Sequence, residues 1–350
     1  MSVWSVPIGS QLDPSSFLEE ILVTKINISE ALRNSAIDTQ NSLRRLLTEE
    51  AQRDPGFPRL LVGADNDFIG GSFGRRTKVQ PFDDIDIYIP LDGAGLLYNS
   101  RGVQSCALLS DNATFGNPLS GAAWMATATA AAGEHLSSEA ILAAFANVLG
   151  RRYPDIKRIR KVGEALRIPI ALGDDLGFDV VPCFVLDFPN SRQLRVYLIP
   201  DGHNGWFRTN PRYDVALTDA LSQRTNKNFR KAVKILKFWN SSIFSNKLGS
   251  YYIELALQKA VLEQVTAGKG LEPLSFAVAF AFWALNQALG SGNLNSWVTD
   301  APQVTPGSLS PSDIDLLASL GSVAWQAWEQ ERKWQLQEAT ASWEVIFGPK

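Results

Sequence analysis

The chain has 350 residues, of which 45% are hydrophobic and 20% are charged, so it is long enough for two domains or lobes with large buried cores. Its net charge of −3 excludes the global basic field that dedicated DNA- or RNA-binding proteins carry. The two cysteines, Cys106 and Cys183, are far apart in sequence, which excludes a disulfide framework and fits a reducing cytoplasm. The two histidines have no cysteine cluster near them, so the sequence shows no zinc site.

No segment predicts secretion or membrane insertion. Residues 1–14 lack the basic region followed by an apolar run that a signal peptide requires. The most apolar stretch covers residues 276–285, which is too short to cross a bilayer and is typical of a buried core helix. We therefore expect a cytoplasmic protein without a membrane partner.

The pattern of the sequence changes near residue 205. Short β-like runs dominate before this point, whereas long helical patterns and eight of the ten tryptophans follow it. This change predicts an α+β fold with two lobes. We expect a mixed β-sheet lobe with N-terminal helices over residues 1–205 and a helical lobe over residues 206–350.

The elements expected in the first lobe follow in chain order. Residues 37–53 have the spacing of an amphipathic helix, which Pro55 and Gly56 end. A turn at Gly70 and Gly71 leads to a strand over residues 84–89, where acidic and apolar residues alternate. Residues 91–136 are rich in small residues and turn signals, so we expect an irregular insertion or flap there. A helix with a serine cap follows over 138–149, and strands are expected over 156–162, 166–172 and 178–185, with a turn over 173–177.

Helical spacing continues through the second lobe. Helices are predicted over residues 227–243, 251–265 and 274–289. Residues 311–347 are also helical in pattern and are expected to form more than one helix, beginning at a cap on Ser310 with a proline in the first turn.

The most informative motif is a pair of acids on the strand over residues 84–89. Asp84 and Asp86 are two positions apart, so both carboxylates leave the same face of the strand, while Ile85 and Ile87 point into the core. Two like charges this close repel each other unless a cation lies between them. Hard oxygen ligands of this kind suit Mg²⁺, which typically takes one or two carboxylates together with substrate phosphates.

A third acid, Asp179, lies on another predicted strand. If that strand pairs beside residues 84–89, three carboxylates converge on one face. Such a set can hold two metal ions roughly 4 Å apart, which bind the attacking and leaving oxygens of an in-line displacement. We therefore expect two Mg²⁺ ions, with Mn²⁺ as a substitute, on Asp84, Asp86 and Asp179. Asp83 is interpreted as an exposed strand cap, and Asp174 and Asp175 as turn residues.

A glycine-rich turn supplies the complementary part of a phosphate site. Gly71 lets the backbone approach a triphosphate, and its N–H group with the Ser72 hydroxyl can bind phosphate oxygens. An isolated D-x-D pair on a strand is common, and an isolated Gly-Gly-Ser turn is commoner still. The two motifs together, with Ser72 twelve residues before Asp84 and a later strand aspartate, are a much more specific signal of a catalytic site.

A second constellation lies in the predicted helical lobe. The helix over 227–243 carries a basic stripe that includes Lys234 and Lys237. Either the stripe is a solvated face, or Lys237, with or without Lys234, faces the cleft and neutralises a triphosphate. Ser250 and Tyr251 open the next helix, where phosphate is favoured and a tyrosine can stack on a base. The alternative is that Ser250 is a helix cap and Tyr251 is part of the core.

A further basic run flanks a predicted turn. Its members are Arg151, Arg152, Lys157, Arg158, Arg160 and Lys161. A solvated face is the default interpretation of such a run, and a ligand or activator site is the alternative.

These motifs together resemble a known family. Gly71-Ser72-Phe73 through Asp84-x-Asp86, followed by Asp179, resembles the signature of polymerase-β-type nucleotidyltransferases. The resemblance narrows to the bacterial CD-NTases of CBASS antiviral defence, relatives of cyclic GMP–AMP synthase and oligoadenylate synthase. The segments that narrow it are Thr209-Asn210-Pro211, Leu236-Lys237-Phe238-Trp239-Asn240, Ser250-Tyr251-x-x-Glu254 and Trp343-x-x-Ile346-Phe347-Gly348.

The resemblance implies a two-lobed fold with the active site in the cleft between the lobes. Asp84, Asp86 and Asp179 would bind Mg²⁺, with Asp179 close to the attacking hydroxyl. Gly71, Ser72, Lys237 and Ser250 would hold the donor triphosphate, and Tyr251 would stack on a nucleobase. The substrates would be ATP, GTP or both, and the product a cyclic di- or trinucleotide that activates a separate effector.

Other implications concern partners. The family ending, here Phe347-Gly348, is commonly followed by a few more residues, and in some systems this tail is joined to target proteins by a ubiquitin-like conjugation machinery. We therefore expect this chain to be trimmed or to lack the tail, and we expect conjugation or regulatory proteins as partners. The absence of a zinc motif separates the chain from the animal DNA sensor, so direct DNA binding is not expected.

One departure from the family and two alternative functions stand beside this interpretation. The family often has Arg-Gly-Thr where this chain has Arg75-Arg76-Thr77, and the second arginine would alter the lid over the phosphates. One alternative is a nucleotidyltransferase that modifies a protein, an RNA or a small molecule, which would leave a nucleotide on its acceptor. The other is a nucleotide-binding scaffold with a vestigial site, which would not turn over NTPs.

Overall fold

The computed structural model describes residues 14–61, 68–80, 84–100, 106–110, 118–121, 124–127, 134–153, 160–162, 164–169, 177–186, 195–298 and 301–348. It divides into two compact units. One comprises Ile28–Ala216 with Asn295–Gln303 and is called the sheet unit below. The other comprises Met1–Asn27, Leu217–Leu294 and Val304–Lys350 and is called the helical unit.

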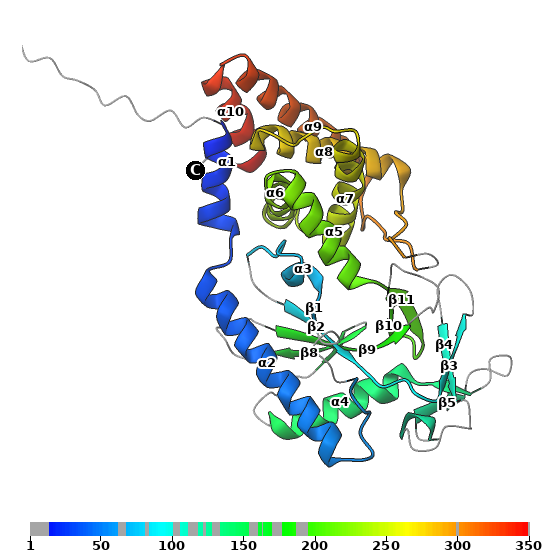
Figure 1. Ribbon diagram of the computed structural model, residues 1–350. Coiled ribbons are helices and arrows are strands. Elements are labelled where there is room, and N and C mark those ends of the chain that lie inside the picture. The colour runs from blue at the N-terminus through cyan, green and yellow to red at the C-terminus, as the bar shows by residue number, and fades with distance from the viewer. Residues whose placement is uncertain are drawn as a thin grey trace, which may run out of the picture. The chain divides into compact units, whose positions relative to one another are not determined.

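A mixed β-sheet forms the centre of the sheet unit (Figure 1). Its strands are β1 (Phe68–Ile69), β2 (Asp84–Pro90), β3 (Leu96–Ser100), β4 (Cys106–Ser110), β7 (Arg160–Val162), β8 (Ala165–Pro169), β9 (Gly177–Leu186), β10 (Val196–Pro200) and β11 (Trp206–Thr209). The order is β1-β2-β9-β10-β11-β4-β3, with β8 also paired to β9 and β7 paired to β8. The β2–β9 pair is parallel, whereas β8–β9 and β10–β9 are antiparallel. β5 (Met125–Thr127) and β6 (Glu134–Leu136) form a separate pair.

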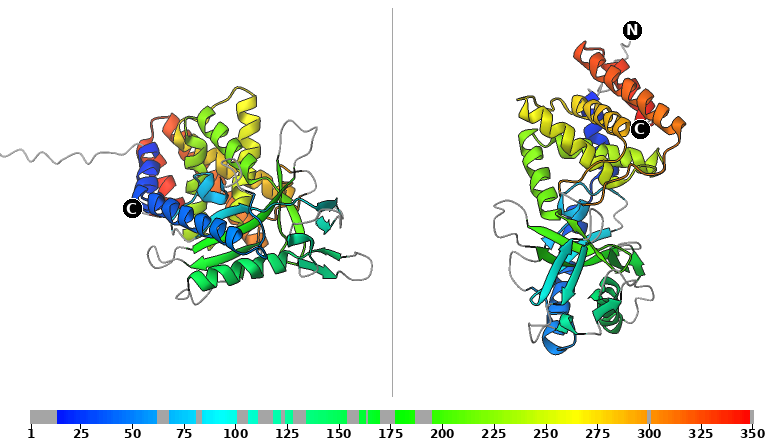
Figure 2. Two further views of the ribbon diagram at one scale, coloured as in Figure 1. Left: turned by 60° about the horizontal axis from the view of Figure 1, so that its bottom comes forward. Right: turned by 90° about the vertical axis from the view of Figure 1, so that its right-hand side faces the viewer.

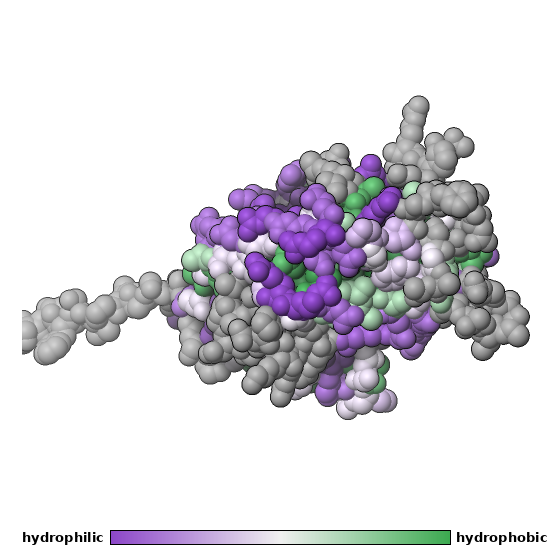
Figure 3. Space-filling model, turned by 90° about the horizontal axis from the view of Figure 1, so that it is seen from below, coloured by the Kyte–Doolittle hydropathy of each residue, from purple (hydrophilic) through white to green (hydrophobic). Residues whose placement is uncertain are grey.

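Two helices, α2 (Glu30–Arg53) and α4 (Ser138–Arg152), cover one face of this sheet (Figure 2). Their buried residues share one core with Ile85 and Ile87 of β2 and with Phe178 and Val180 of β9. Alternation along the strands therefore leaves the acidic positions on the opposite face. Where the surface in Figure 3 is coloured, it is mostly hydrophilic around small apolar patches.

Two details of the sheet unit differ from the expectations, and a third lies mostly outside the described residues. The helix expected over 37–53 begins at Glu30, because the Ser29 hydroxyl accepts a hydrogen bond from the Leu32 N–H group at 3.2 Å. The described parts of residues 91–136 are largely paired strands, so the expectation of an irregular insertion was wrong there. In these parts, β3 and β4 extend the main sheet. The expected turn over 173–177 lies outside the described residues apart from Gly177, which begins β9.

The remaining helices of the sheet unit are short. They are α3 (Gly71–Gly74), the 3-10 helix η2 (Pro118–Ser120) and the first part of α5 (Pro211–Arg224). The helical unit contains the rest of α5, α1 (Pro14–Ile21), the π-helix η1 (Leu22–Ile26), α6 (Asn228–Ser242), α7 (Ser250–Thr266), α8 (Leu274–Ser291), α9 (Pro311–Arg332) and α10 (Leu336–Phe347).

Aromatic side chains form much of the core of the helical unit. The ring of Trp239 on α6 lies 4.8 Å from that of Phe244 and 5.3 Å from that of Phe282 on α8. Among the described residues, α8 is the helix that is long and apolar enough to cross a membrane, and 56% of it is buried. Because α8 packs against α6, α7 and α9, this burial favours the core helix that the sequence predicted.

The compact units do not coincide with the expected ranges 1–205 and 206–350. The N-terminal helices α1 and η1 belong to the helical unit, because they pack on α10, α8 and α6 and bury Phe17, Leu18 and Leu22 there. Strand β11 and the start of α5 stay in the sheet unit, because β11 pairs with β10 and β4.

Candidate active site

The parallel pairing of β2 and β9 brings the three predicted acids onto one face of the sheet. Asp86 lies directly opposite Asp179, and Asp84 lies opposite Gly177, two positions away. Since side chains alternate along a strand, Asp84, Asp86 and Asp179 all point away from the core under α2 and α4. The convergence expected from the sequence is therefore found in the backbone register.

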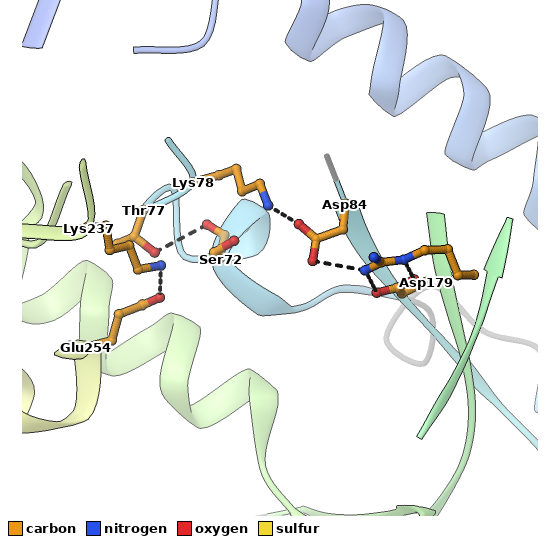
Figure 4. A network of polar contacts seen from close by, with 8 residues as sticks. Ser72, Thr77, Lys78, Asp84, Asp179, Lys237 and Glu254 are labelled. Atoms are coloured by element: carbon orange, nitrogen blue, oxygen red, sulfur yellow. Dashed lines mark hydrogen bonds and ion pairs between the residues drawn. The ribbon is translucent and has the colours of Figure 1, made fainter. Parts of the chain in front are cut away.

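Two cations contact this acidic face. The guanidinium of Arg167 on β8 donates to both oxygens of Asp179, with Nε–Oδ1 at 2.9 Å and Nη2–Oδ2 at 2.7 Å. Its Nη2 also lies 3.6 Å from Oδ2 of Asp84. The ammonium of Lys78 contacts Oδ1 of the same Asp84 carboxylate, as Figure 4 shows. Asp84 therefore has a cation on each of its two oxygens.

The glycine turn lies directly against Asp86. Gly71 has a φ of +57°, a left-handed conformation that favours glycine, and a Cβ at this position would overlap with the Asp86 carboxylate. Burial and the charge of Asp179 raise the pKa of Asp86 above its ordinary value, against the lowering effect of Arg75, Lys78 and Arg167. The Gly71-Ser72 turn and the acidic face thus form one continuous site within the sheet unit.

The same turn fixes the position of Lys78. The Ser72 carbonyl accepts hydrogen bonds from the Thr77 N–H group at 2.9 Å and from the Lys78 N–H group at 3.1 Å. Thr77 is fully buried, and its hydroxyl also lies 3.4 Å from the Ser72 carbonyl oxygen. These bonds close the loop after α3 and direct Lys78 toward Asp84.

The donor set suits a hard divalent cation, because Asp84, Asp86 and Asp179 offer only carboxylate oxygens on one face. Gly71, where a Cβ would overlap with Asp86, keeps backbone N–H groups next to these carboxylates. Within the described part of the chain, however, no group of three or more His, Cys, Asp and Glu side chains is placed to hold a metal ion. The side chains of Asp84 and Asp179 instead face Arg167 and Lys78. The residue types fit the chemistry of a metal site, and in this structure Arg167 and Lys78 contact the Asp84 and Asp179 carboxylates.

The helical unit holds the other predicted site residues. Lys237 on α6 has only 5% of its side chain exposed and forms an ion pair with Glu254 on α7, which is 2% exposed (Figure 4). Gly249 occupies the cap position of α7, so Ser250 is an exposed first residue of the helix rather than its cap. Tyr251 is partly buried, whereas its neighbour Tyr252 is fully buried.

The basic stripe of α6 is largely engaged within the helical unit. Lys231 pairs with Glu19, Arg230 pairs with Asp219, and the Nζ atom of Lys234 lies 2.9 Å from Oδ1 of Asn27. This arrangement favours neither a purely solvated face nor a phosphate contact for Lys234. It explains instead why the N-terminal helices dock on α6.

Two members of the other basic run form ion pairs within the sheet unit. Arg151 lies 2.5 Å from Glu50, and Lys161 lies 2.5 Å from Glu139. Both pairs are partly exposed, which agrees with the default interpretation of a solvated face. Lys157 and Arg158 lie outside the described residues, as do Asp83, Asp174 and Asp175.

Sequence reasoning did not find Arg167, Lys78 or Glu254. Arg167 is identified only by the antiparallel register that sets it opposite Asp179. The available sequence signal for Arg167 was a basic residue on a short strand before Asp179. This signal is weak unless the pairing of β8 with β9 is known. Glu254 belonged to a quoted motif, but its contact with Lys237 depends on how α6 packs on α7.

A mixed sheet with three acids on one face beside a Gly-Ser turn, together with a helical C-terminal part, is the arrangement that the sequence analysis expected. The chain is 29% identical over 201 residues to a probable cyclic nucleotide synthase, IK1_05630, of Bacillus cereus strain VD146. That match covers 57% of this chain and 56% of the relative, so it spans little more than half of either protein. No protein-family model matches the chain.

Solved structures agree with the fold. CdnC of E. coli MS115-1 in complex with HORMA-deltaN matches with a TM-score of 0.63 and 15% identity, over 97% of this chain and 98% of that one. CdnC with ATP matches with a TM-score of 0.59 and 15% identity, over 97% and 99%. The expected α+β fold is confirmed as the fold of CdnC. The partial sequence match to a probable cyclic nucleotide synthase agrees with the resemblance that the motifs gave.

Proposed function

We propose that this chain is a metal-dependent nucleotidyltransferase that joins NTPs into a cyclic di- or trinucleotide. The observation that carries the proposal is the placement of Asp84, Asp86 and Asp179 on one face of β2 and β9, against the Gly71-Ser72 turn. The likeness to a probable cyclic nucleotide synthase and to CdnC supports the same reaction class.

Asp84, Asp86 and Asp179 would hold Mg²⁺ or Mn²⁺, which would lower the pKa of the acceptor hydroxyl and stabilise the leaving pyrophosphate. Gly71 and Ser72 hold the donor triphosphate through backbone N–H groups and the serine hydroxyl. The acceptor ribose oxygen attacks the donor α-phosphorus in line. One oxygen–phosphorus bond to the acceptor forms as the bond to the β-phosphate oxygen breaks, and pyrophosphate leaves. Repetition of this step on the linear intermediate closes the ring.

The helical unit contributes the remaining assigned residues. Following the resemblance, we assign Lys237 and Ser250 to the triphosphate and Tyr251 to the nucleobase. Lys237 is paired with buried Glu254 in this structure, so its charge reaches a phosphate only if that pair opens or the phosphate joins it. Ser250 is exposed and needs no such rearrangement.

The proposed setting is cytoplasmic antiphage signalling of the CBASS kind. ATP, GTP or both are the substrates, and a separate effector responds to the cyclic product. CdnC has been seen with ATP and with a HORMA protein. By analogy, a regulatory protein of that or the conjugating kind is a candidate partner of this chain.

The direct test is product identification. The protein is incubated with the four NTPs and Mg²⁺, residual phosphates are removed with phosphatase, and the product is identified by mass spectrometry and linkage-specific nuclease digestion. We expect a phosphatase-resistant cyclic product that the Asp84→Ala/Asp86→Ala variant does not make and that Asp38→Asn, an exposed α2 control, makes normally.

Three outcomes would contradict this proposal. Label transferred to a protein, an RNA or a small acceptor would identify the other nucleotidyltransferase activity. Nucleotide binding without any turnover would indicate a scaffold with a vestigial site. Turnover near wild-type level in Asp84→Ala/Asp86→Ala would show that the carboxylates are not the catalytic site.

A further inference from the structure

Arg76 adopts a backbone conformation that its side chain disfavours. Its φ is +59°, in the left-handed region where residues with a Cβ atom are uncommon and glycine is favoured. The residue is exposed, so no burial of its side chain compensates for this conformation. It lies at the end of the loop that starts at Gly71-Ser72, and its N–H group donates to the Phe73 carbonyl at 3.1 Å. A non-glycine residue held here points to a role for its side chain.

A second arginine lies beside this loop. The guanidinium carbon of Arg33 on α2 is 4.6 Å from the ring centre of Phe73, which is only 1% exposed. Burial and the positive charge of Arg76 both lower the pKa of Arg33, so the two guanidinium groups are close enough to repel each other. The stacking on Phe73 therefore holds the Arg33 guanidinium at a position where the positive charge of Arg76 repels it.

Neither arginine has an acidic partner among the residues that the structure describes. Within the part of the chain that the structure describes, Arg33 and Arg76 form no ion pair and no side-chain hydrogen bond. Other basic residues of the sheet unit have an acidic partner, among them Lys78, Arg151, Lys161 and Arg167. Two mutually repelling guanidinium groups at Phe73, beside a phosphate-type turn and without an acidic partner in the described part of the chain, are the arrangement that an anion stabilises.

We propose that Arg33 and Arg76 form a polyphosphate-binding site that receives the terminal phosphates of the donor NTP. Gly71 and Ser72 hold the triphosphate from the turn, and the two guanidinium groups contact the end that leaves as pyrophosphate. This site rests on the proposed function for its natural ligand, because it continues the same turn. The anion relieves the repulsion between the two arginines, which accounts for keeping an arginine at a left-handed position.

The test uses inorganic tripolyphosphate as the probe, with binding measured by calorimetry on the full chain in the presence of EDTA. Arg76→Asn keeps a residue that tolerates the left-handed conformation and removes the charge. Arg33→Met keeps an unbranched chain over Phe73 and removes the charge. Arg45→Gln is the matched control, because Arg45 is on the same helix with a side chain that is 76% exposed.

We expect wild type and Arg45→Gln to bind tripolyphosphate equally and Arg76→Asn and Arg33→Met to bind roughly tenfold more weakly or worse, as expected for loss of a charge-assisted contact. Arg76→Lys should retain part of the affinity. The melting temperature of Arg76→Asn should be unchanged or higher, because left-handed strain and repulsion are both reduced. Wild-type affinity in both Arg76→Asn and Arg33→Met, or no binding of tripolyphosphate to the wild type, would overturn the proposal.

The outcome is separable from that of the proposed function. If tripolyphosphate binding depends on Arg33 and Arg76 but no cyclic product forms, the site stands and the synthase assignment fails. If cyclic product forms and the arginine variants leave both tripolyphosphate binding and the KM for ATP unchanged, the synthase assignment stands and this site fails.

Discussion

Arg167 and Asp179 face each other across the antiparallel β8–β9 pair, and their side chains form two hydrogen bonds of 2.9 and 2.7 Å. The Arg167 side chain is 38% exposed, whereas that of Asp179 is 10% exposed. The carboxylate therefore loses most of its water and gains a bidentate guanidinium in exchange. Asp86 lies opposite Asp179 on the neighbouring parallel strand β2. Its carboxyl is in a different environment, because burial and the charge of Asp179 raise the pKa of Asp86.

This difference predicts opposite stability effects at two acids of the same face. A raised pKa in the folded state means that folding penalises ionised Asp86 at pH 7, so Asp86→Asn should increase the free energy of unfolding. Asp179→Asn should decrease it by about 1 kcal/mol, since a partly exposed charged hydrogen-bonded pair is lost. Urea unfolding in EDTA at pH 7 measures both. Effects of the same sign would show that the two acids share one environment.

Arg167 should also compete with a divalent cation for the same carboxylates. Replacing it with glutamine removes the positive charge from Asp179 and Asp84, so Mn²⁺ should bind more tightly in the absence of nucleotide. We expect roughly a tenfold gain, equivalent to about 1.4 kcal/mol. Paramagnetic detection of free Mn²⁺ gives the affinity, and Arg45→Gln serves as the control. Weaker Mn²⁺ binding by Arg167→Gln would mean that the arginine orients the carboxylates for the metal instead of displacing it.

Local pattern was sufficient to predict the acidic face but not its counter-charges. Alternation along residues 84–89 put Asp84 and Asp86 on one face, since a strand has a period of two. Whether Asp179 joins them depended on a strand pairing between segments about a hundred residues apart, which the sequence raised only as a condition. Arg167 lies opposite Asp179 because of the register of a second strand pair, β8 with β9. No local sequence pattern encodes that register.

Tertiary packing decided the features in which the structure differs from the expectations. The N-terminal helices were assigned to the sheet lobe by their position in the sequence, but Phe17 and Leu18 are buried in the helical unit. The turn-rich composition of residues 91–136 favoured a loop, yet β3 and β4 complete the sheet edge through backbone bonds that depend little on side-chain type.

The Lys237–Glu254 pair should matter for stability whatever its role toward phosphate. Both side chains are almost fully buried, so Lys237→Met removes the ammonium that faces the buried Glu254 carboxylate and should cost about 3–5 kcal/mol. The double variant Lys237→Met/Glu254→Leu should recover most of that loss. Denaturant unfolding of the set checks this. A single variant as stable as wild type would indicate that the pair contributes little to the fold, and loss of NTP binding in a stable double variant would support the phosphate role of Lys237.

A pH dependence is expected at the start of α9. Hydrogen bonds from Lys247 and Ser310 lower the pKa of Asp313 to about 2 from an ordinary value of 3.8. Its contribution to stability is therefore complete above about pH 4 and is lost as the pH falls through about 2. Asp313→Asn should lower the urea midpoint at pH 6 and change it little at pH 2. An equal difference at both pH values would show that the effect does not come from the ionised carboxylate.

Tyr251 and Tyr252 provide a matched pair for the proposed base contact. Tyr252 is fully buried, and its hydroxyl donates to the Gly292 carbonyl at 2.8 Å, whereas Tyr251 is partly exposed at the first turn of the same helix. If Tyr251 stacks on a nucleobase, Tyr251→Ala should weaken NTP binding by about 1–3 kcal/mol, and Tyr251→Phe should weaken it little.

Tyr252→Ala is the control for a core tyrosine, and it should lower the melting temperature because a large buried side chain is removed. Calorimetric titration with ATP and GTP, beside thermal unfolding of each variant, separates the two roles. A Tyr251→Ala variant that binds NTP normally and melts early, as the Tyr252→Ala variant is expected to melt, would place Tyr251 in the core. Loss of binding at an unchanged melting temperature would instead support the stacking role, because the aromatic face is then needed for the ligand and not for the fold.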